Sequence, residues 1–330
     1  MNLKNNPTLK SWKIRVGLTI GDPAGIGPAI TLKAVKILKG KADFTVIGDS
    51  FVLAKAAKIL KISLDSVKLV NLNNVEKSNF SFGSLSAHNG RSSLEYLDKS
   101  LELLRNGQID CLVTCPISKE AIDLAGCKFS GHTEYLGMRT GAKDLVMMLV
   151  NKKIKFSLAT RHVRLGDVPR MLTRRILKKN ILDTVRGLQG LFLIKRPKLV
   201  VCGINPHASD NGVIGTEEQS IITPVIRSLN NRSNGFFINK VLGADVAIAQ
   251  AVEGKFDCVI AAYHDQALIA LKLTDFDSGV NLTLGLPFVR TSPLHGVAFD
   301  IAHKPDLANP YSLVAAVKLA IECTLNQKKA

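Results

Sequence analysis

The stretch that decides the fold is Asp257-Cys258-Val259-Ile260-Ala261-Ala262-Tyr263-His264-Asp265-Gln266. Its continuous apolar part is typical of a buried β-strand, and the strand would end at an imidazole and a carboxylate, those of His264 and Asp265. In open α/β sheets, ligands bind at the carboxyl ends of the strands. The stretch therefore predicts a sheet of this kind with a ligand site at His264.

Two more of the seven histidines, His162 and His207, also follow short apolar runs. Imidazole is the commonest metal ligand, and three protein ligands with one open position are typical of catalytic rather than structural metal sites. The trio His162, His207 and His264 therefore suggests a metal site, which the carboxylates of Asp265 and Asp245 could join. A single histidine after a strand is more often structural, so position alone leaves both interpretations equally open.

Length and composition indicate an ordinary globular protein. Because 330 residues are many for one core, we expect residues 1–330 to form a single unit of two closely joined lobes. Hydrophobic residues make up 46% and charged residues 22%, as in typical soluble proteins. No apolar stretch approaches the roughly 20 residues that span a bilayer, and the start of the chain lacks the apolar core of a signal peptide. A cytoplasmic protein without membrane contact is expected.

Charge and cysteine content limit the classes of partner. The net charge of +17 is compatible with nucleic-acid binding, but the basic residues are scattered, and one Trp and four Tyr offer few surfaces for base stacking. Anionic metabolites explain the charge more simply, so no nucleic-acid partner is expected. Six cysteines without a CxxC pair predict free thiols, most of them buried, rather than disulfides.

Short β-branched runs alternate with amphipathic segments along most of the chain, which is typical of an α/β fold with a parallel sheet covered by helices. No segment resembles a flexible linker between domains. Strands are expected at 14–20, 44–47, 67–72, 111–114, 146–150, 155–159, 199–203 and 258–262, helices at 27–38, 92–105, 176–189, 217–229, 244–252 and 311–325, and polar loops at 77–90 and 209–216.

Two glycine-containing segments stand where helices are expected to begin. Residues 21–28 follow the first strand, and residues 131–136 place His132 and Thr133 at a helix N-terminus, where Thr133 could cap free amides. Helix N-termini favour anions, and glycine lets a backbone approach a ligand closely. The GxGxxG and Walker-lysine patterns are absent. Taken alone, each segment is as compatible with a structural turn as with a binding loop.

Three polar side chains interrupt the otherwise apolar sequence after His264. Lys272, Asn281 and Arg290 supply an ammonium, an amide and a planar guanidinium. Such a set can hold a small molecule with two anionic groups, because arginine binds a phosphate or carboxylate through two parallel hydrogen bonds. Each residue taken singly is as compatible with a solvated surface, but their position beside His264 and Asp265 favours a site.

The order of the motifs is more specific than any one of them. Six motifs follow one another: Gly21-Asp22-Pro23-Ala24-Gly25-Ile26-Gly27-Pro28, Gly131-His132-Thr133-Glu134, Asn205-Pro206-His207-Ala208, Tyr263-His264-Asp265-Gln266, Gly285-Leu286-Pro287-Phe288-Val289-Arg290-Thr291-Ser292-Pro293 and His295-Gly296-Val297-Ala298-Phe299-Asp300-Ile301-Ala302. Together they resemble the 4-hydroxythreonine-4-phosphate dehydrogenase (PdxA) family of pyridoxal phosphate biosynthesis. The resemblance runs from about residue 14 to residue 325.

The resemblance implies a homodimer with a two-lobed α/β/α fold of the isocitrate and isopropylmalate dehydrogenase type, whose active site lies in the cleft between the lobes at the dimer interface. It assigns one divalent metal per site, such as Zn, Mg or Co, to three histidines contributed by both subunits. It also implies contacts with a phosphorylated hydroxy-amino acid and a non-Rossmann loop for NAD or NADP. The residues matched are His162, His207 and His264 for the metal, His132, Thr133, Lys272, Asn281 and Arg290 for the substrate, and His295, Gly296 and Asp300 for the cofactor.

The reaction implied by the resemblance is oxidation of 4-phosphooxy-L-threonine at C3, followed by decarboxylation to 3-amino-2-oxopropyl phosphate. In this reading Lys272 transfers a proton or binds the carboxylate, Arg290 binds an anionic end, and Asp265 or Asp245 orients the ligating histidines. A paralogue that oxidises erythronate or threonate 4-phosphate is the nearest alternative. An acyltransferase of related architecture and a nucleic-acid-binding module are the alternatives from other classes.

Several positions depart from the family pattern. Ala29 stands where the family usually has Glu, and Ala267 and His303 stand where it usually has Gly. The Gly usually found after the second histidine motif is replaced in Ala208-Ser209-Asp210, and the Pro-Ala-Asp-Thr motif is reduced to Gly243-Ala244-Asp245-Val246. None of these changes removes an expected ligand, but they leave substrate preference and cofactor geometry open.

Overall fold

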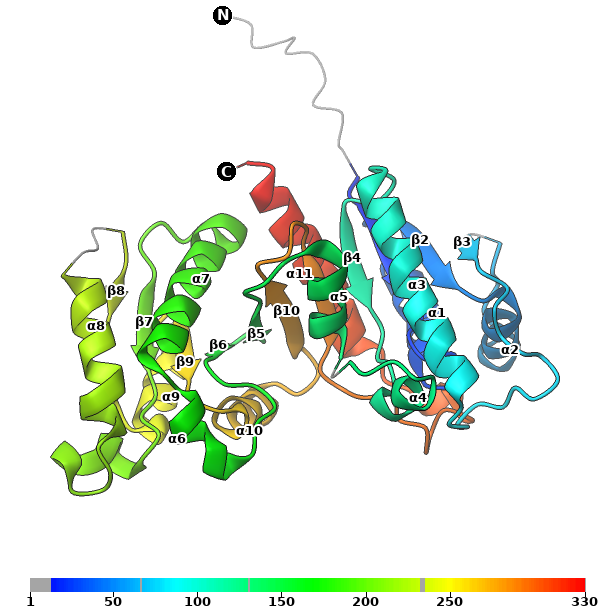
Figure 1. The fold of residues 1–330 in the computed structure, drawn as a ribbon. Coiled ribbons are helices and arrows are strands. Elements are labelled where there is room, and N and C mark those ends of the chain that lie inside the picture. Colours follow the sequence, from blue (N-terminus) through cyan, green and yellow to red (C-terminus); the bar gives the residue numbers. More distant parts are fainter. Residues whose placement is uncertain (1–12, 66, 130, 232–234, 330) are drawn as a thin grey trace, which may run out of the picture.

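One mixed sheet of 11 strands runs through the whole molecule in the order β3-β2-β1-β4-β11-β10-β5-β6-β9-β7-β8 (Figure 1). The computed structural model describes residues 13–329 except 66, 130 and 232–234, so the start of the chain, on which the signal-peptide expectation rests, lies outside the described residues. The strands are β1 (Arg15–Thr19), β2 (Asp43–Gly48), β3 (Lys68–Asn71), β4 (Cys111–Thr114), β5 (Val146–Val150), β6 (Lys155–Leu158), β7 (Lys198–Val201), β8 (Phe237–Ile238), β9 (Cys258–Ala261), β10 (Val280–Leu284) and β11 (Arg290–Pro293).

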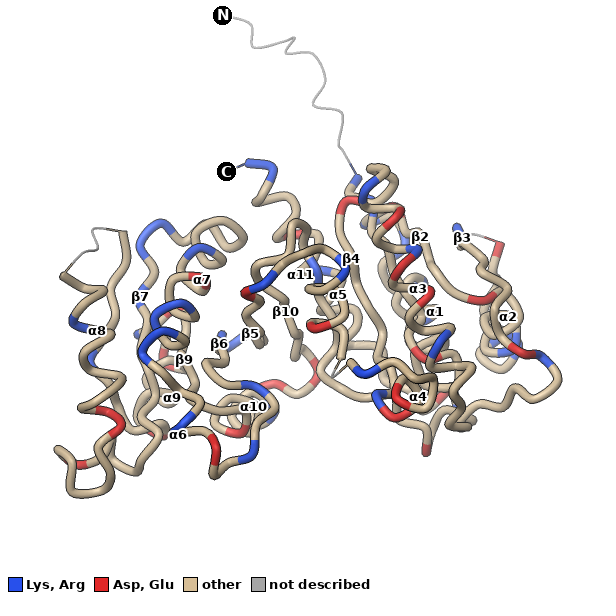
Figure 2. Tube along the Cα trace, in the orientation of Figure 1, with Lys and Arg blue, Asp and Glu red and all other residues tan. Residues whose placement is uncertain are grey.

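Helices cover both faces of this sheet. They are α1 (Gly27–Ile37), α2 (Ser50–Leu60), α3 (Ala87–Arg105), α4 (Lys119–Leu124), α5 (His132–Thr140), α6 (Val168–Met171), α7 (Arg174–Phe192), α8 (Thr223–Asn230), α9 (Ala244–Val252), α10 (His264–Thr274) and α11 (Tyr311–Gln327). No described helix is both long and apolar enough to span a membrane. Lysine and arginine are spread over both halves of the molecule and interleaved with acidic residues (Figure 2).

The expectation of a wholly parallel sheet is wrong at the centre. β10 pairs antiparallel with both β11 and β5, and β5 pairs antiparallel with β6. The β5–β6 connection is a tight turn in which Asn151 Oδ1 accepts hydrogen bonds from the backbone N–H groups of Lys153 and Ile154. On either side of this centre the strands pair parallel. The sheet therefore joins two parallel halves, and this agrees with the two-lobed α/β expectation.

The strand-end positions of the three histidines are confirmed. β6, β9 and β7 are neighbours that run parallel, with Leu158 opposite Ala261 and Val201 opposite Ile260. His162, His264 and His207 follow the ends of these three strands. Parallel neighbours end at the same edge of a sheet, so the sequence correctly placed all three histidines at one edge.

The two faces of the sheet are covered differently. On one face α11, α7 and α1 pack on the central strands and bury the largest apolar cluster of the chain. On the other face α3 contacts β1, β2 and β4, while α10 contacts β5, β6 and β9. The part of β5, β10 and β11 that lies between these helices on the second face is where a cavity opens.

Some expected element boundaries are wrong for local reasons. The helix expected at 217–229 is a five-residue π-helix, Glu218–Ile222, followed by α8. α3 begins at Ala87, because Ser86 Oγ accepts a hydrogen bond from the Asn89 N–H and caps the helix earlier than the polar composition of 77–90 indicated. The departures Ala29 and Ala267 are both buried in the core, on α1 and α10.

A left-handed turn follows β7. His207, Ala208, Ser209, Asp210 and Asn211 all have φ between 45° and 67°. For residues with a Cβ this conformation costs roughly 1–2 kcal/mol each. Ser209 is also buried, at 1% exposed, and its hydroxyl has no hydrogen-bond partner among the described residues. This turn is the place where the usual glycine of the family is replaced.

Replacing Ser209 by glycine is expected to stabilise the protein by about 1 kcal/mol, because it relieves a Cβ held at positive φ and removes an unpartnered buried hydroxyl. The gain is smaller than the sum of these effects, since glycine adds entropy to the unfolded chain. Chemical denaturation would measure it. The control is Ser100→Gly inside α3, where φ is ordinary and the same change should destabilise. A loss of stability in Ser209→Gly would contradict the strain argument.

Candidate active site

A cavity of about 250 Å3 opens over the central strands, between α4 and α5 on one side and α10 on the other. Asn281 on β10 and Arg290 on β11 line its floor, because Asn281 lies opposite Ser292 and Thr283 lies opposite Arg290 in the register, which puts these side chains on one face. His132, His162, His264 and His295 line its walls. The structure thus brings together residues that are up to 180 positions apart, from Pro116 to Gly296.

Arg290 is buried, with 1% of its surface exposed, and no carboxylate forms an ion pair with it among the described residues. Its Nη1 donates to Thr283 Oγ1 at 3.0 Å and its Nη2 to Thr114 Oγ1 at 2.6 Å, while Nε has no partner within the described chain. Burial lowers the pKa of the guanidinium to about 9, and the charge of Glu134 raises it slightly in return. A buried cation without a counter-ion is costly unless an anion binds beside it.

His132 begins α5, and its Nε2 is buried without a hydrogen-bond partner among the described residues. Burial, together with the charge of Arg290, holds the pKa of this imidazole well below its usual value. The expectation that Thr133 caps this helix is wrong, because the N-cap is Gly131 and the helix start has no side-chain cap hydrogen bond. Thr133 is itself buried at the helix start and lines the cavity.

Four buried polar atoms of the cavity lack a partner in the described part of the chain. They are His132 Nε2, Asn281 Oδ1, Arg290 Nε and His295 Nε2. Buried polar groups in folded proteins are nearly always hydrogen-bonded, so a concentration of unpartnered ones marks a place where a ligand or water completes the set. Arg290 Nε donates and belongs to a cation without an ion-paired carboxylate in the described part of the chain, whereas Asn281 Oδ1 accepts. Since His295 Nδ1 faces the Gly296 carbonyl, the neutral ring offers its Nε2 as an acceptor. The cavity therefore fits a small anionic molecule.

His162 and His264 lie side by side on the cavity wall, with ring centroids 5.7 Å apart. His264 Nδ1 is 2.7 Å from Asp265 Oδ1, so a proton on Nδ1 leaves the Nε2 lone pair free for a metal. The pKa of His162 is lowered, first by burial and then by the charge of Lys119, which favours the neutral form that metals bind.

His207 does not join this pair within one chain. It is exposed, lies in the left-handed turn and does not line the cavity. Over residues 13–329, apart from the few left undescribed, no group of three His, Cys, Asp or Glu side chains could hold a metal ion. A complete three-histidine site would thus need His207 from a second chain.

Three of the expected catalytic or supporting residues lie outside the cavity of a single chain. Lys272 is exposed on α10, eight residues after His264, and shares the helix face of His264 and Leu268, both of which line the cavity. Asp265 is exposed but contacts His264. Asp245 is exposed on α9.

The expected cofactor loop packs against the first glycine motif. The N–H of Ile26 donates to the Val297 carbonyl at 2.9 Å, and a Cβ on Gly25 would lie 2.9 Å from the same oxygen, so only glycine fits there. His295 and Gly296 line the cavity, whereas Asp300 is exposed at the far end of the loop. Two motifs about 270 residues apart in sequence thus form one surface beside the cavity.

Asp22, in the same glycine motif, is fully buried. Its Oδ1 accepts a hydrogen bond from the Ala24 N–H at 2.9 Å, but Oδ2 has no partner among the described residues. Burial raises the pKa of this carboxyl to about 7, which the Ala24 hydrogen bond lowers only in part. The folded protein therefore holds this proton at pH values where the unfolded chain has lost it.

Asp22→Asn is expected to stabilise the protein in a pH-dependent way. The pKa of Asp22 is raised to about 7 in the folded protein, whereas an aspartate in the unfolded chain has a pKa of about 4. The stability that the protonated Asp22 gives the wild type is therefore fully present below about pH 4 and is lost as the pH rises to about 7. Asparagine keeps the acceptor for the Ala24 N–H but has no charge to bury. The free energy of unfolding of Asp22→Asn should therefore rise relative to wild type by roughly 2–3 kcal/mol between pH 5 and pH 8. Denaturant unfolding at both pH values measures it, and an advantage independent of pH would contradict the pKa argument.

Comparison with known proteins agrees with this geometry. The sequence model of the family described as pyridoxal phosphate biosynthetic protein PdxA matches residues 40–320. The chain belongs to the PdxA family. A 4-hydroxythreonine-4-phosphate dehydrogenase of Sulfurihydrogenibium sp. is 40% identical over 319 residues, covering 93% of this chain and 98% of its own. A relative named putative D-threonate 4-phosphate dehydrogenase, from Symbiobacterium thermophilum, is 36% identical over 87% of this chain and 90% of its own.

Solved structures place this PdxA chain among the same enzymes. The 4-hydroxythreonine-4-phosphate dehydrogenase of Klebsiella pneumoniae aligns with a TM-score of 0.83 at 31% identity, over 94% of this chain and 99% of its own. An isocitrate dehydrogenase of Methylococcus capsulatus aligns over 96% of this chain and 87% of its own with a TM-score of 0.50 at 13% identity, which shows a shared fold alone. The expected relation to the isocitrate dehydrogenase fold is thereby confirmed.

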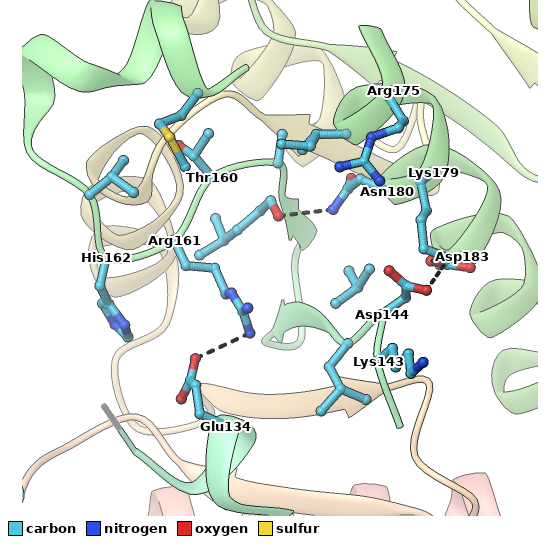
Figure 3. A pocket seen from close by; sticks show the side chains of 17 residues that line it. Glu134, Lys143, Asp144, Thr160, Arg161, His162, Arg175, Lys179, Asn180 and Asp183 are labelled. Atoms are coloured by element: carbon cyan, nitrogen blue, oxygen red, sulfur yellow. Dashed lines mark hydrogen bonds and ion pairs between the residues drawn. The ribbon is translucent and has the colours of Figure 1, made fainter. Parts of the chain in front are cut away.

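Two charged residues of the cavity in this PdxA chain were not predicted, Lys119 and Glu134. Lys119 follows the end of β4 closely, so the strand-end argument used for the histidines would have found it. Glu134 stands in the quoted motif beside His132 and Thr133. It forms an ion pair with Arg161, 3.5 Å from Nη1 to Oε1 (Figure 3), and borders a second pocket of about 400 Å3 that also contains His162.

Proposed function

We propose that this chain is an NAD- or NADP-dependent 4-hydroxythreonine-4-phosphate dehydrogenase that requires a divalent metal. The reaction is oxidation of the C3 hydroxyl of 4-phosphooxy-L-threonine followed by loss of CO2 to give 3-amino-2-oxopropyl phosphate. The observation that carries the proposal is Arg290, a buried guanidinium with no ion-paired carboxylate among the described residues, on the floor of a cavity of about 250 Å3 beside two imidazoles. Family membership and the names of its relatives support the same reaction.

The substrate would lie on the cavity floor with an anionic group against Arg290. The unpartnered Nε of Arg290 can donate to a phosphate oxygen, whereas Asn281 Oδ1 and the Nε2 of neutral His132 can accept from a hydroxyl or ammonium. Thr133 lines the same wall. Lys272, which is exposed on α10 and two turns after His264, would reach the substrate from the rim of the cavity. Water is excluded from the floor because Arg290, Thr283 and Thr114 are all buried.

The side chains present fit a divalent metal. His162 and His264 are adjacent, the pKa of His162 is lowered toward the neutral form, and Asp265 orients His264. These two would hold a Zn, Mg or Co ion together with His207 of the partner subunit, and Asp245 would support the His207 of its own chain, since both lie beside Gly243. When bound, such an ion supplies Lewis acidity to the substrate hydroxyl.

A homodimer would complete this site. α10, which begins at His264, exposes two large apolar side chains, Ile269 at 61% and Leu273 at 82%, and Phe276, 64% exposed, follows just after its end at Thr274. Exposed apolar groups gathered on one helix typically mark a protein contact. Because the same helix carries His264 and Lys272, a partner packed on it would lie next to the cavity. The oligomer and the shared metal site are thus parts of one proposal.

The nicotinamide cofactor would bind along the surface formed by residues 295–302 and the Gly25–Ile26 turn. The contact between Ile26 and Val297 joins these segments, and Gly25 keeps the backbone open to close approach. His295 and Gly296 at the cavity end and Asp300 at the outer end mark its two limits. When bound, this cofactor would supply the acceptor for the hydride of the substrate. A cytoplasmic location is part of the same proposal. All six cysteines are free thiols, and the reducing cytoplasm keeps thiols in that state.

The experiment that tests the proposal follows the absorbance of the reduced nicotinamide with 4-phosphooxy-L-threonine, with and without a chelator. We expect turnover that the chelator abolishes and that added Zn, Mg or Co restores. D-threonate and erythronate 4-phosphate form the comparison arm, which the relative named putative D-threonate 4-phosphate dehydrogenase makes necessary. Faster turnover of a sugar-acid phosphate would select that alternative. No turnover of any of them with either cofactor would overturn the proposal.

A further inference from the structure

Two opposite charges of the cavity approach the same point above Gly131. A Cβ placed on Gly131 would lie 3.6 Å from Glu134 Oε2 and 3.7 Å from Lys119 Cε. The two side chains nevertheless form no ion pair with each other within the described chain. The absent side chain of Gly131 therefore leaves a small space bordered by a carboxylate on one side and an ammonium-bearing chain on the other.

Glu134 is the one carboxylate that lines the catalytic cavity among the described residues. Figure 3 shows it on α5, pointing toward Arg161, with His162 nearby. Oε1 takes part in the Arg161 ion pair at 3.5 Å, whereas Oε2 forms no hydrogen bond to any described residue. Its charge also raises the pKa of Arg290 on the floor. One oxygen of this carboxylate thus lies beside Arg161, and the other borders the space above Gly131 without a hydrogen-bond partner among the described residues.

Lys119 is the first residue of α4 and is exposed at the mouth of the cavity. It takes part in none of the ion pairs or hydrogen bonds found among the described residues. It lines the same cavity as His162, and its charge lowers the pKa of that imidazole. A lysine in this position is a cation, unpaired among the described residues, that borders the cavity.

We propose that Glu134 and Lys119 recognise the head group of an α-amino acid, so that this site selects a phosphorylated amino acid over a phosphorylated sugar acid. Glu134 Oε2 binds the α-ammonium, Lys119 binds the α-carboxylate, and Arg290 is left for the phosphate. An ammonium among the cations Lys119, Arg161 and Arg290 would be repelled without this one carboxylate. A sugar acid carries an uncharged hydroxyl at that carbon and gains only an ordinary hydrogen bond. The inference rests on the proposed dehydrogenase activity and names its substrate class.

The test replaces Glu134 by glutamine in the metal-loaded enzyme and compares kcat/KM for 4-phosphooxy-L-threonine and D-threonate 4-phosphate. The change is nearly isosteric and removes only the charge. We expect a loss of about 100-fold with the amino acid and less than about threefold with the sugar acid. The ratio of the two kcat/KM values should therefore shift by more than about 30-fold, mainly through KM. Lys119→Met should weaken both substrates alike, because both carry the carboxylate.

The matched control is Arg161→Gln, which removes the partner of Glu134 without changing a residue that lines the catalytic cavity. It should leave the substrate ratio within about threefold of wild type. Equal losses on both substrates in Glu134→Gln, or the same ratio shift in Arg161→Gln, would overturn the proposal and make Glu134 a support for Arg290. Failure of the proposed dehydrogenase function can be told apart from failure of the Glu134 proposal, because in the first case the wild-type enzyme would oxidise neither substrate.

Discussion

Replacing Arg290 by methionine is expected to lower kcat/KM about 1,000-fold without lowering the stability of the fold. The guanidinium is the buried cation of the cavity floor, and its Nε is free to bind an anion. Loss of a desolvated, charge-assisted contact to a phosphate or carboxylate costs about 4 kcal/mol of transition-state binding. Methionine has a similar volume and leaves no charge buried, so the free energy of unfolding should stay the same or rise.

Steady-state kinetics and denaturant unfolding of the Arg290→Met variant measure the two effects separately. Arg170→Met is the control, because that guanidinium is 82% exposed and pairs only with Asp167. Its removal should change neither quantity measurably. Unchanged kcat/KM in Arg290→Met would remove Arg290 from the site. A large loss of stability would instead show that the Thr283 and Thr114 hydrogen bonds hold the fold together.

The second large effect concerns the histidines. His207→Ala and His264→Ala are each expected to lose bound metal and at least about 1,000-fold in activity, since each removes one of three ligands. If His207 completes the site of the partner subunit, refolding an equal mixture of the two variants should restore about a quarter of wild-type activity. Half of the dimers then contain both variants, and each of these has one site with all its ligands. Activity and metal content of the mixture are the readouts.

The control mixture combines His162→Ala with His264→Ala. These two rings are 5.7 Å apart in one chain, so a mixed dimer carries a damaged pair in both sites and should stay inactive. No recovery in the His207 and His264 mixture would contradict a site shared in this way. Recovery in both mixtures would mean that His162 and His264 act in different sites of the dimer despite their proximity within one chain.

The part of the fold that follows from local sequence was predictable. β4, β5 and α9 have the expected bounds, because each is a continuous apolar or amphipathic run whose ends are set by nearby polar residues. β10 and β11 were missed because their side chains alternate. Leu282 and Leu284 enter the core while Asn281, Thr283 and Arg290 face the cavity or its floor, so neither strand forms an apolar run. The antiparallel centre of the sheet consequently could not be foreseen either.

The site residues that follow strand ends or stand in recognisable motifs were predictable. His132, Asn281 and Arg290 lie together as expected, and so do His162 and His264. The strand-end rule could have predicted Lys119, and Glu134 stands in a motif, but their proximity to each other depends on how the turn at Gly131 packs against the start of α4. The left-handed turn at His207 carries no local signal at all, since its sequence lacks the glycines that such backbone favours.

The late elements β11 and α11 pack against β4 in the first half of the chain, and this has a consequence for synthesis on the ribosome. β4 has its partner β11 only after residue 290, and α11, which covers β4 and β11, is the last helix made. A nascent chain that has already produced β1 to β9 therefore still exposes an unpaired strand edge and the apolar face beneath α11. Such surfaces are prone to aggregate. Completion of the first half must wait until α11 has been made, so a product that is stalled or truncated before residue 311 should depend on chaperones or be degraded.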